Sequence, residues 1–214
     1  MGGIHSASAI ILAGGQSRRM GTPKATLKFG NSTILERVLV ELGGDFDDIL
    51  VVAAPASSEP FSIEHLLGTL PSVRLLRDES AYEGAAIALS RGLVAAVNDI
   101  AFACSCDLPL MRVEVVRALY AMLNGYDAVL PVIEGRPQPL FAFYRRDTAA
   151  LIELQLALGE RRLTSITGAL TAYRPENGEL RQFDPDLRSF LNINTWEDYL
   201  RARAIYDSLG AKHS

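Results

Sequence analysis

The sequence predicts an α/β domain in which a doubly wound, mostly parallel central sheet carries helices on both faces. Two observations lead to this fold class. Short, wholly apolar segments, such as 9–12, 49–54 and 100–105, alternate with longer segments whose apolar residues recur at helical spacing. A strand that is apolar throughout is buried on both faces, and this burial requires helices on both sides of a parallel sheet joined by right-handed crossovers.

The elements follow one another in a βαβαβαβ rhythm. The first strand, 9–12, ends at the adjacent glycines 14 and 15. Thr33 and Glu36 form a capping-box pattern that predicts the start of a helix, which ends at the glycine pair 43–44. Further strands are predicted over 49–54, 73–76, 100–105, 127–132, 140–144 and 190–194, and further helices over 63–67, 84–97, 113–123, 148–158, 161–170 and from Thr195 onward.

Composition limits the classes of partner. With 214 residues, of which 49% are hydrophobic, the chain is expected to form one domain over residues 1–214. A net charge of −4 argues against a nucleic-acid partner, and the chain has no apolar run long enough for a membrane partner. The only cysteines, Cys104 and Cys106, are two residues apart and poorly placed for a disulfide, so we expect a cytoplasmic protein with free thiols.

The loop after the first strand predicts an anion site. Residues 13–24 combine two adjacent glycines with Arg18, Arg19 and Lys24, and Lys28 follows shortly after. Glycines let backbone N–H groups approach a ligand, and the cations can neutralise several phosphate oxygens, a combination that suits a nucleoside triphosphate. Neither the dinucleotide fingerprint nor the P-loop pattern is present, and a solvated basic loop is the alternative on pattern alone.

Together, the motifs resemble those of the molybdenum cofactor guanylyltransferases. They are "LAGGQSRRMGTPKATL" at 12–27, "RD" at 77–78, "CSCDLP" at 104–109, "GRPQPLFAFY" at 135–144, "GERRL" at 159–163 and "NINTWEDYL" at 192–200. The resemblance implies a Rossmann-like nucleotidyltransferase fold, with a nucleotide-binding half of about 1–110 and an acceptor-binding half of about 111–214. It also implies transfer of a guanylyl group from GTP to molybdopterin or the molybdenum cofactor, with Mg²⁺ as cofactor and release of pyrophosphate.

The resemblance assigns the nucleotide contacts. The backbone of Leu12, Ala13 and Gly14 is expected to meet the guanine base, and Gly15 to allow its close approach. "AGG" stands here where related cytidylyltransferases read "LAAG", which favours guanine. Lys24 and Arg19 match the cations that neutralise the phosphates; Arg18 and Lys28 are weaker candidates, with ordinary surface charge as their alternative.

It also assigns the acids and the acceptor side. Asp107, directly after an apolar strand, matches the aspartate that binds the metal and the triphosphate, and Mg²⁺ needs only one or two carboxylates besides phosphate and water. Asp78 matches an acid that contacts the nucleotide, although it can equally cap a turn. Asn192 and Asn194 alternate along the predicted strand and would share one face toward the acceptor. Arg19, Lys24 and Asp107 are thus the predicted catalytic residues.

Two segments depart from the pattern, and several alternatives stay open. "YEGAAIAL" at 82–89 replaces a "GPLAG" type of loop, and alanine occupies 53 and 54 where asparagine is common. Phe141, Tyr144 and Trp196 are expected in the core. A cytidylyl- or sugar-phosphate nucleotidyltransferase, or a non-catalytic nucleotide-binding homologue, is the alternative function. Proteins that deliver molybdopterin and molybdoenzymes are further expected partners.

Overall fold

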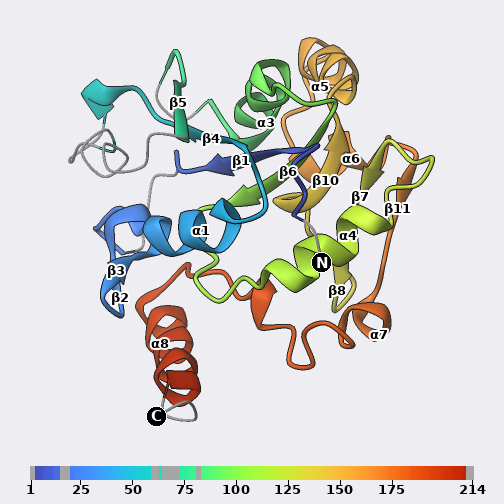
Figure 1. Ribbon diagram of the computed structural model, residues 1–214. Helices are drawn as coiled ribbons and strands as arrows, with labels where there is room; N and C mark the ends of the chain where they lie inside the picture. Colours follow the sequence, from blue (N-terminus) through green and yellow to red (C-terminus); the bar gives the residue numbers. More distant parts are fainter. Residues whose placement is uncertain (1–2, 15–19, 59–62, 64–72, 81–82, 211–214) are drawn as a thin grey trace.

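The computed structural model describes residues 3–14, 20–58, 63, 73–80 and 83–210. Its centre is a seven-stranded sheet in the order β11-β7-β10-β6-β1-β4-β5 (Figure 1). All neighbouring strands are parallel except at β10, which runs antiparallel to both β6 and β7. The strands are β1 (Ser8–Leu12), β4 (Asp48–Ala53), β5 (Val73–Arg77), β6 (Ile100–Ser105), β7 (Ala128–Val129), β10 (Phe141–Arg145) and β11 (Ala172–Tyr173). The predicted fold class is confirmed.

Helices cover both faces of this sheet. Figure 1 shows α1 and α4 on one side and α3, α5 and α6 on the other. The helices are α1 (Ile34–Gly43), α3 (Ala85–Ala95), α4 (Val113–Ala121), α5 (Thr148–Ala157), α6 (Leu163–Gly168), α7 (Asn177–Leu180) and α8 (Trp196–Gly210). Along β1, Ile11 packs into the core on the α1 side while Ile10 and Leu12 pack into the core on the α3 side. From Ala9 to Leu12 the strand is therefore apolar toward both helix layers.

Smaller elements complete the part of the chain that the structure describes. Two hairpins, β2 (Lys28–Phe29) with β3 (Ser32–Thr33) and β8 (Val132–Ile133) with β9 (Arg136–Pro137), lie outside the main sheet. Three short 3₁₀ helices are η1 (Lys24–Thr26), η2 (Ala56–Ser58) and η3 (Arg188–Phe190). Helix α8 packs on the first hairpin through an apolar cluster that includes Phe29, Ile34, Ile193 and Ala202.

The start of α1 confirms the capping-box prediction. The Thr33 hydroxyl accepts from the backbone N–H of Glu36 at 3.2 Å, and the Glu36 carboxylate accepts from the backbone N–H of Thr33. These bonds satisfy two donors that a helix start leaves unpaired. The hydrogen bond from the Thr33 N–H also lowers the pKa of Glu36, with burial acting in the opposite direction.

Two predicted strands are wrong in part or in full. The strand expected over 127–132 stops at Val129, because Pro131 has no N–H to continue the ladder, and Val132 begins a separate hairpin. The segment 190–194 forms no strand: Phe190 ends η3, and Ile193 donates a backbone hydrogen bond to the carbonyl of Asp107 at 3.0 Å. Of the helix expected over 63–67, only Ile63 lies within the described residues.

Of the three aromatic residues expected in the core, two are buried and one is exposed. Phe141 and Tyr144 are buried, as expected, and burial raises the pKa of the Tyr144 hydroxyl, which donates to the carbonyl of Pro139 at 2.6 Å. Trp196 is 48% exposed, so its assignment to the core is wrong. It stands at the first turn of α8 and contacts Tyr199 edge-to-face, at the border of the apolar cluster.

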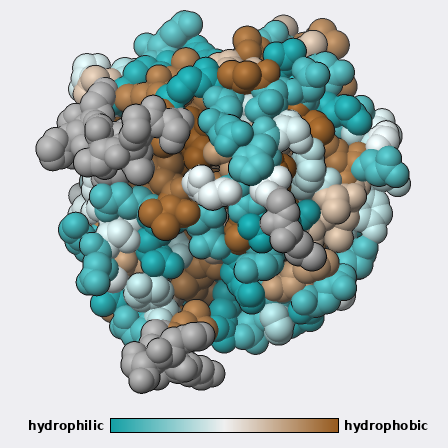
Figure 2. Space-filling view, viewed as in Figure 1, coloured by the Kyte–Doolittle hydropathy of each residue, from teal (hydrophilic) through white to brown (hydrophobic). Residues whose placement is uncertain are grey.

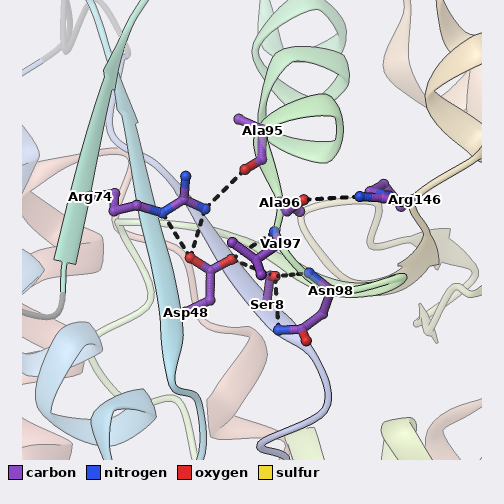
Figure 3. Close-up of polar contacts among 8 residues, drawn as sticks. All are labelled: Ser8, Asp48, Arg74, Ala95, Ala96, Val97, Asn98 and Arg146. Carbon is purple, nitrogen blue, oxygen red and sulfur yellow. Dashed lines mark hydrogen bonds and ion pairs between the residues drawn. The ribbon is translucent and has the colours of Figure 1, made fainter.

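A polar network fixes the amino edge of the sheet. Buried Asp48 at the start of β4 accepts hydrogen bonds from the Ser8 hydroxyl (2.6 Å), the Val97 N–H (3.0 Å) and Arg74 Nε (2.8 Å). Figure 3 shows these side chains converging between β1, β5 and the end of α3. Asn98 adds a backbone hydrogen bond to the Ser8 hydroxyl at 3.1 Å. One carboxylate thus joins three strands and a helix end.

Surface properties agree with a globular domain. On the face seen in Figure 2, hydrophilic residues surround smaller hydrophobic groups. None of the helices in the described ranges combines the length and apolar character that crossing a membrane requires.

We predict that Asp48→Ala lowers the free energy of unfolding by about 3 kcal/mol, because it leaves buried donors from Ser8 and Val97 without their acceptor. Urea titration followed by circular dichroism measures the change. Asp47→Ala is the matched control, since Asp47 is 73% exposed and forms an ion pair with exposed His5, and it should change the value by about 0.5 kcal/mol or less. Equal stability of the two variants would contradict the role given to the network.

Candidate active site

The carboxyl ends of β1, β4, β5 and β6 lie at one edge of the sheet. From β1 the chain crosses to β4 and then β5 on one side, and it later returns to β6 on the other side. Strand β1 is therefore a topological switch point, the place where open α/β sheets bind ligands. The residues that follow these four strands form the candidate site.

Lys24, Asp107 and Asn194 meet at this edge. The ammonium of Lys24, in η1, donates hydrogen bonds of 2.8 Å to Oδ2 of Asp107 and of 2.8 Å to Oδ1 of Asn194. The Lys24 side chain is 18% exposed and that of Asp107 only 8%, so this ion pair is largely shielded from solvent. Shielding strengthens the attraction between the two charges. We call these three residues the lysine cluster.

Backbone bonds on both sides hold Asp107 in place. Strand β6 ends at Ser105, and the N–H of Cys106 donates to the carbonyl of Leu12 at the end of β1 (3.0 Å). The carbonyl of Asp107 accepts from Ile193. Within the described residues, Oδ1 of Asp107 is buried and has no hydrogen-bond partner. A buried carboxylate oxygen of this kind needs a donor or a cation from outside the described chain.

Asn194 is held by a residue that the sequence reasoning missed. The carboxylate of Asp198 accepts from the backbone N–H of Asn194 (2.9 Å) and of Thr195 (2.8 Å). Burial opposes ionisation of Asp198, yet these hydrogen bonds lower its pKa overall. The four-residue pattern from Thr195 to Asp198 is a capping-box signal. Asn192 and Asn194 are exposed on either side of buried Ile193. Exposure thus alternates along the segment as predicted, although the segment forms no strand.

Gly14 and Asp78 form a second group along the same edge. The N–H of Asp78 donates to the carbonyl of Ala53 at 2.8 Å, which places Asp78 beside the end of β4. A Cβ on Gly14 would lie 3.1 Å from the nitrogen of Ala54 and 3.5 Å from Oδ2 of Asp78. A side chain at position 14 would therefore come into contact with this carboxylate and with the backbone of Ala54.

Arg91 also belongs to this second group, and the sequence reasoning missed it. It lies on α3 and donates from Nη1 to Oδ1 of Asp78 at 3.2 Å and to the carboxylate of Glu83. Burial raises the pKa of Asp78, while the hydrogen bond and charge of Arg91 act in the opposite direction. No spacing in the sequence indicates this contact, because Arg91 reaches Asp78 only through the packing of α3 on the sheet.

The other predicted site residues are placed as follows. Leu12 ends β1, and the N–H of Ala13 continues its ladder to the carbonyl of Val52 at 2.8 Å. Lys28 is exposed on β2, and its carbonyl accepts from the Tyr199 hydroxyl. Gly15, Arg18 and Arg19 lie outside the described residues.

The donor set fits a magnesium ion that is shared with a polyphosphate. In the described part of the chain, no three His, Cys, Asp or Glu side chains gather into a metal cage. The unsatisfied oxygen of Asp107 offers one carboxylate ligand, and Mg²⁺ characteristically takes one or two carboxylates plus phosphate oxygens and water. The residues present are consistent with the predicted cofactor.

The two cysteines lie beside this site without exposure to it. Cys104 and Cys106 are buried and free. Burial raises the pKa of Cys106 to about 12, with Asp107 acting in the same direction, and it raises that of Cys104 as well. Burial thus disfavours the thiolate, which is the nucleophilic form, at both cysteines near neutral pH.

Comparisons with known proteins agree on one family. The family model described as "MobA-like NTP transferase domain" matches residues 9–174. A relative from Methanosarcina mazei named "Probable molybdenum cofactor guanylyltransferase" is 34% identical, over 89% of this chain and 87% of its own. One from Syntrophotalea carbinolica named "Molybdenum cofactor guanylyltransferase" is also 34% identical, over 95% of this chain and 93% of its own.

Solved structures give the same picture. Molybdopterin-guanine dinucleotide biosynthesis protein A from Archaeoglobus fulgidus superposes with a TM-score of 0.80 at 25% identity. The match covers 94% of this chain and 99% of that protein. A 4-diphosphocytidyl-2C-methyl-D-erythritol synthase from Anaerococcus prevotii has a TM-score of 0.72 at 15% identity, a likeness that shows the fold alone.

We predict that both thiols of the folded protein resist a soluble disulfide reagent at pH 7 to 9, because burial keeps them protonated and inaccessible. Counting the labelled thiols by mass spectrometry, before and after unfolding in guanidinium, measures this. The folded protein should gain no label within minutes and the unfolded chain should gain two. Rapid labelling of either cysteine in the folded protein would show an accessible thiolate and contradict the burial.

Proposed function

The chain belongs to the family of proteins with a MobA-like NTP transferase domain, and we propose that it transfers the guanylyl group of GTP to molybdopterin, forming the guanine dinucleotide cofactor and pyrophosphate. The observation that carries this proposal is the lysine cluster at the switch point of the sheet. An ammonium and a carboxylate with one unsatisfied oxygen lie together where a triphosphate and its metal ion would bind.

The proposed reaction is an in-line displacement at phosphorus. An oxygen of the terminal phosphate of molybdopterin forms a bond to the α-phosphorus of GTP. The bond from that phosphorus to the oxygen bridging to the β-phosphate breaks, and pyrophosphate leaves with the electron pair. Because the attacking phosphate is already ionised near neutral pH, the protein has to align two anions and reduce their repulsion rather than supply a base.

Each member of the lysine cluster has a proposed task. Lys24 neutralises charge that moves onto the departing pyrophosphate. Asp107 would hold Mg²⁺ through Oδ1, which has no partner among the described residues, and the ion would supply further neutralisation of phosphate charge. Asn194 keeps the ammonium in position through the 2.8 Å hydrogen bond. Asn194 is also proposed to contact the acceptor, together with Asn192, which is exposed two residues earlier in the chain.

The nucleotide base is proposed to bind on the Gly14 side. Backbone groups of Leu12, Ala13 and Gly14 would contact one edge of guanine, and Asp78 would contact another. The closeness of the Asp78 carboxylate to Gly14 supports this assignment. Gly15 and Arg19 keep their proposed roles in the base and phosphate contacts on the resemblance alone.

We also propose a cytoplasmic location. The buried free thiols of Cys104 and Cys106 suit a reducing compartment, which supports this location. Proteins that deliver molybdopterin, and molybdoenzymes that receive the product, stay a prediction from the resemblance.

The first test concerns the nucleotide. With Mg²⁺ present, the protein should bind GTP at least about tenfold more tightly than CTP, because guanine presents two neighbouring donors to a carboxylate and cytosine presents one. Isothermal titration with both nucleotides measures the ratio. Tighter binding of CTP would favour the cytidylyltransferase alternative instead.

The second test concerns turnover. Asp107→Asn and Lys24→Met should each lower the rate of guanylyl transfer about 100- to 1000-fold, because each removes charge that stabilises the transition state. Pyrophosphate release with GTP, Mg²⁺ and molybdopterin measures the rate.

Asp207→Asn is the control for this test, since Asp207 forms an exposed ion pair with Arg203 on α8. It should turn over like the unsubstituted protein. Near-normal transfer by either cluster variant would refute the assigned roles. GTP binding without any transfer by the unsubstituted protein would favour the non-catalytic homologue.

A further inference from the structure

The carboxylate of Asp78 is buried but only partly engaged by its cation. The residue is 7% exposed and follows β5 at the edge that carries the candidate site. The hydrogen bond from Arg91 goes to Oδ1, whereas Oδ2 lies 3.5 Å from the position that a Cβ on Gly14 would occupy. The two oxygens thus face different surroundings, one toward α3 and the other toward a residue without a side chain.

A second buried aspartate of this protein shows the contrasting arrangement. Asp45 is 2% exposed, and Arg117 on α4 donates from Nε to one carboxylate oxygen (2.8 Å) and from Nη2 to the other (2.9 Å). Both oxygens of Asp45 are therefore occupied, as expected for an ion pair that only stabilises the fold. At Asp78 the guanidinium approaches from one side and leaves the other oxygen toward Gly14.

Arg91 is itself held by neighbouring acids. Besides Asp78, it contacts the carboxylate of Glu83, and its Nη2 lies 3.5 Å from the exposed carboxylate of Glu79. One cation thus serves three acids, and the group carries an excess of negative charge. Glu83 fixes the guanidinium from the side of α3, so the hydrogen bond to Asp78 has a defined direction.

This excess of acceptors suits a ligand edge that carries donors. Guanine presents N1–H and the 2-amino group next to each other, and an ionised carboxylate can accept from both. A protonated Asp78 would itself carry a donor and would bind this edge poorly. Burial favours the protonated form, and the charge of Arg91 opposes that tendency.

We propose that Arg91 is a positioning residue for nucleotide selection: it holds Oδ1 of Asp78 and so orients the carboxylate to accept from the donor edge of guanine. This inference rests on the proposed function, because it takes GTP as the donor substrate. Arg91 acts through Asp78 and has no contact of its own with the nucleotide.

The test compares GTP with ITP, whose base lacks the 2-amino group. By isothermal titration with Mg²⁺, the unsubstituted protein should bind GTP about 10- to 100-fold more tightly than ITP. Arg91→Met should reduce this preference to about threefold or less, mainly by weakening GTP, because the carboxylate loses its orientation and charge partner. Arg91→Lys keeps the positive charge but lacks the planar guanidinium with its directed N–H donors, so it should give an intermediate preference for GTP over ITP.

Two further measurements separate positioning from simple destabilisation. Arg117→Met removes an arginine from a comparable buried pair and should keep the full preference for GTP. As the pH is lowered, the Arg91→Met variant should also begin to lose GTP affinity at a higher pH than the unsubstituted protein does. The pKa of Asp78 should rise when Arg91 is lost, because the hydrogen bond and charge that lower it are removed while the acids Glu83 and Glu79 remain.

The outcomes are distinct. An unsubstituted protein that binds neither nucleotide would overturn the proposed function. If the unsubstituted protein binds GTP more tightly than ITP and the Arg91→Met variant keeps the same affinity ratio, only the role of Arg91 is overturned. If Arg91→Met does not fold, the Arg91→Lys variant decides, and a preference equal to that of the unsubstituted protein overturns the inference.

Discussion

The burial of β1 between two parallel neighbours is the constraint on which the rest of the structure depends. All five of its residues are buried, and it pairs with β4 on one side and β6 on the other. The backbone bonds continue past the strand, from Ala13 to Val52 and from Cys106 to Leu12. Because these bonds fix the ends of three strands relative to one another, the groups that follow them, Gly14 and Asp107 among them, meet at one edge.

The two edges of the sheet divide structural and chemical tasks. At the amino edge, Asp48 has its carboxylate fully engaged by neighbouring donors, and this network anchors the end of α3 (Figure 3). The same helix carries Arg91 to the opposite edge. There the carboxylates are less completely satisfied: Asp107 has an oxygen without a partner among the described residues, and Asp78 has one that faces Gly14. Satisfied groups stabilise the fold, whereas unsatisfied ones are available to a ligand.

Local signals in the sequence were sufficient for most elements. The capping box at Thr33 and the apolar run of β1 are read from adjacent residues, and both were predicted correctly. The strand expected at 190–194 failed because strand character needs a partner as well as a pattern, and Ile193 binds a loop carbonyl instead. From the resemblance, Lys24 and Asp107 were both expected at the nucleotide site, but their direct ion pair was not predicted. The contact of Arg91 with Asp78 was not expected, since it depends on how α3 packs.

The bond between Lys24 and Asn194 joins residues 170 positions apart. During synthesis, an emerging chain can complete β1, β4, β5 and β6 well before Asn194 leaves the ribosome. Until then the ammonium of Lys24 lacks the Asn194 oxygen as an acceptor, and the turn that carries Asp107 lacks its bond from Ile193. Chains that end before Asn194 would therefore lack the bonds that join Lys24 and Asp107 to the C-terminal segment.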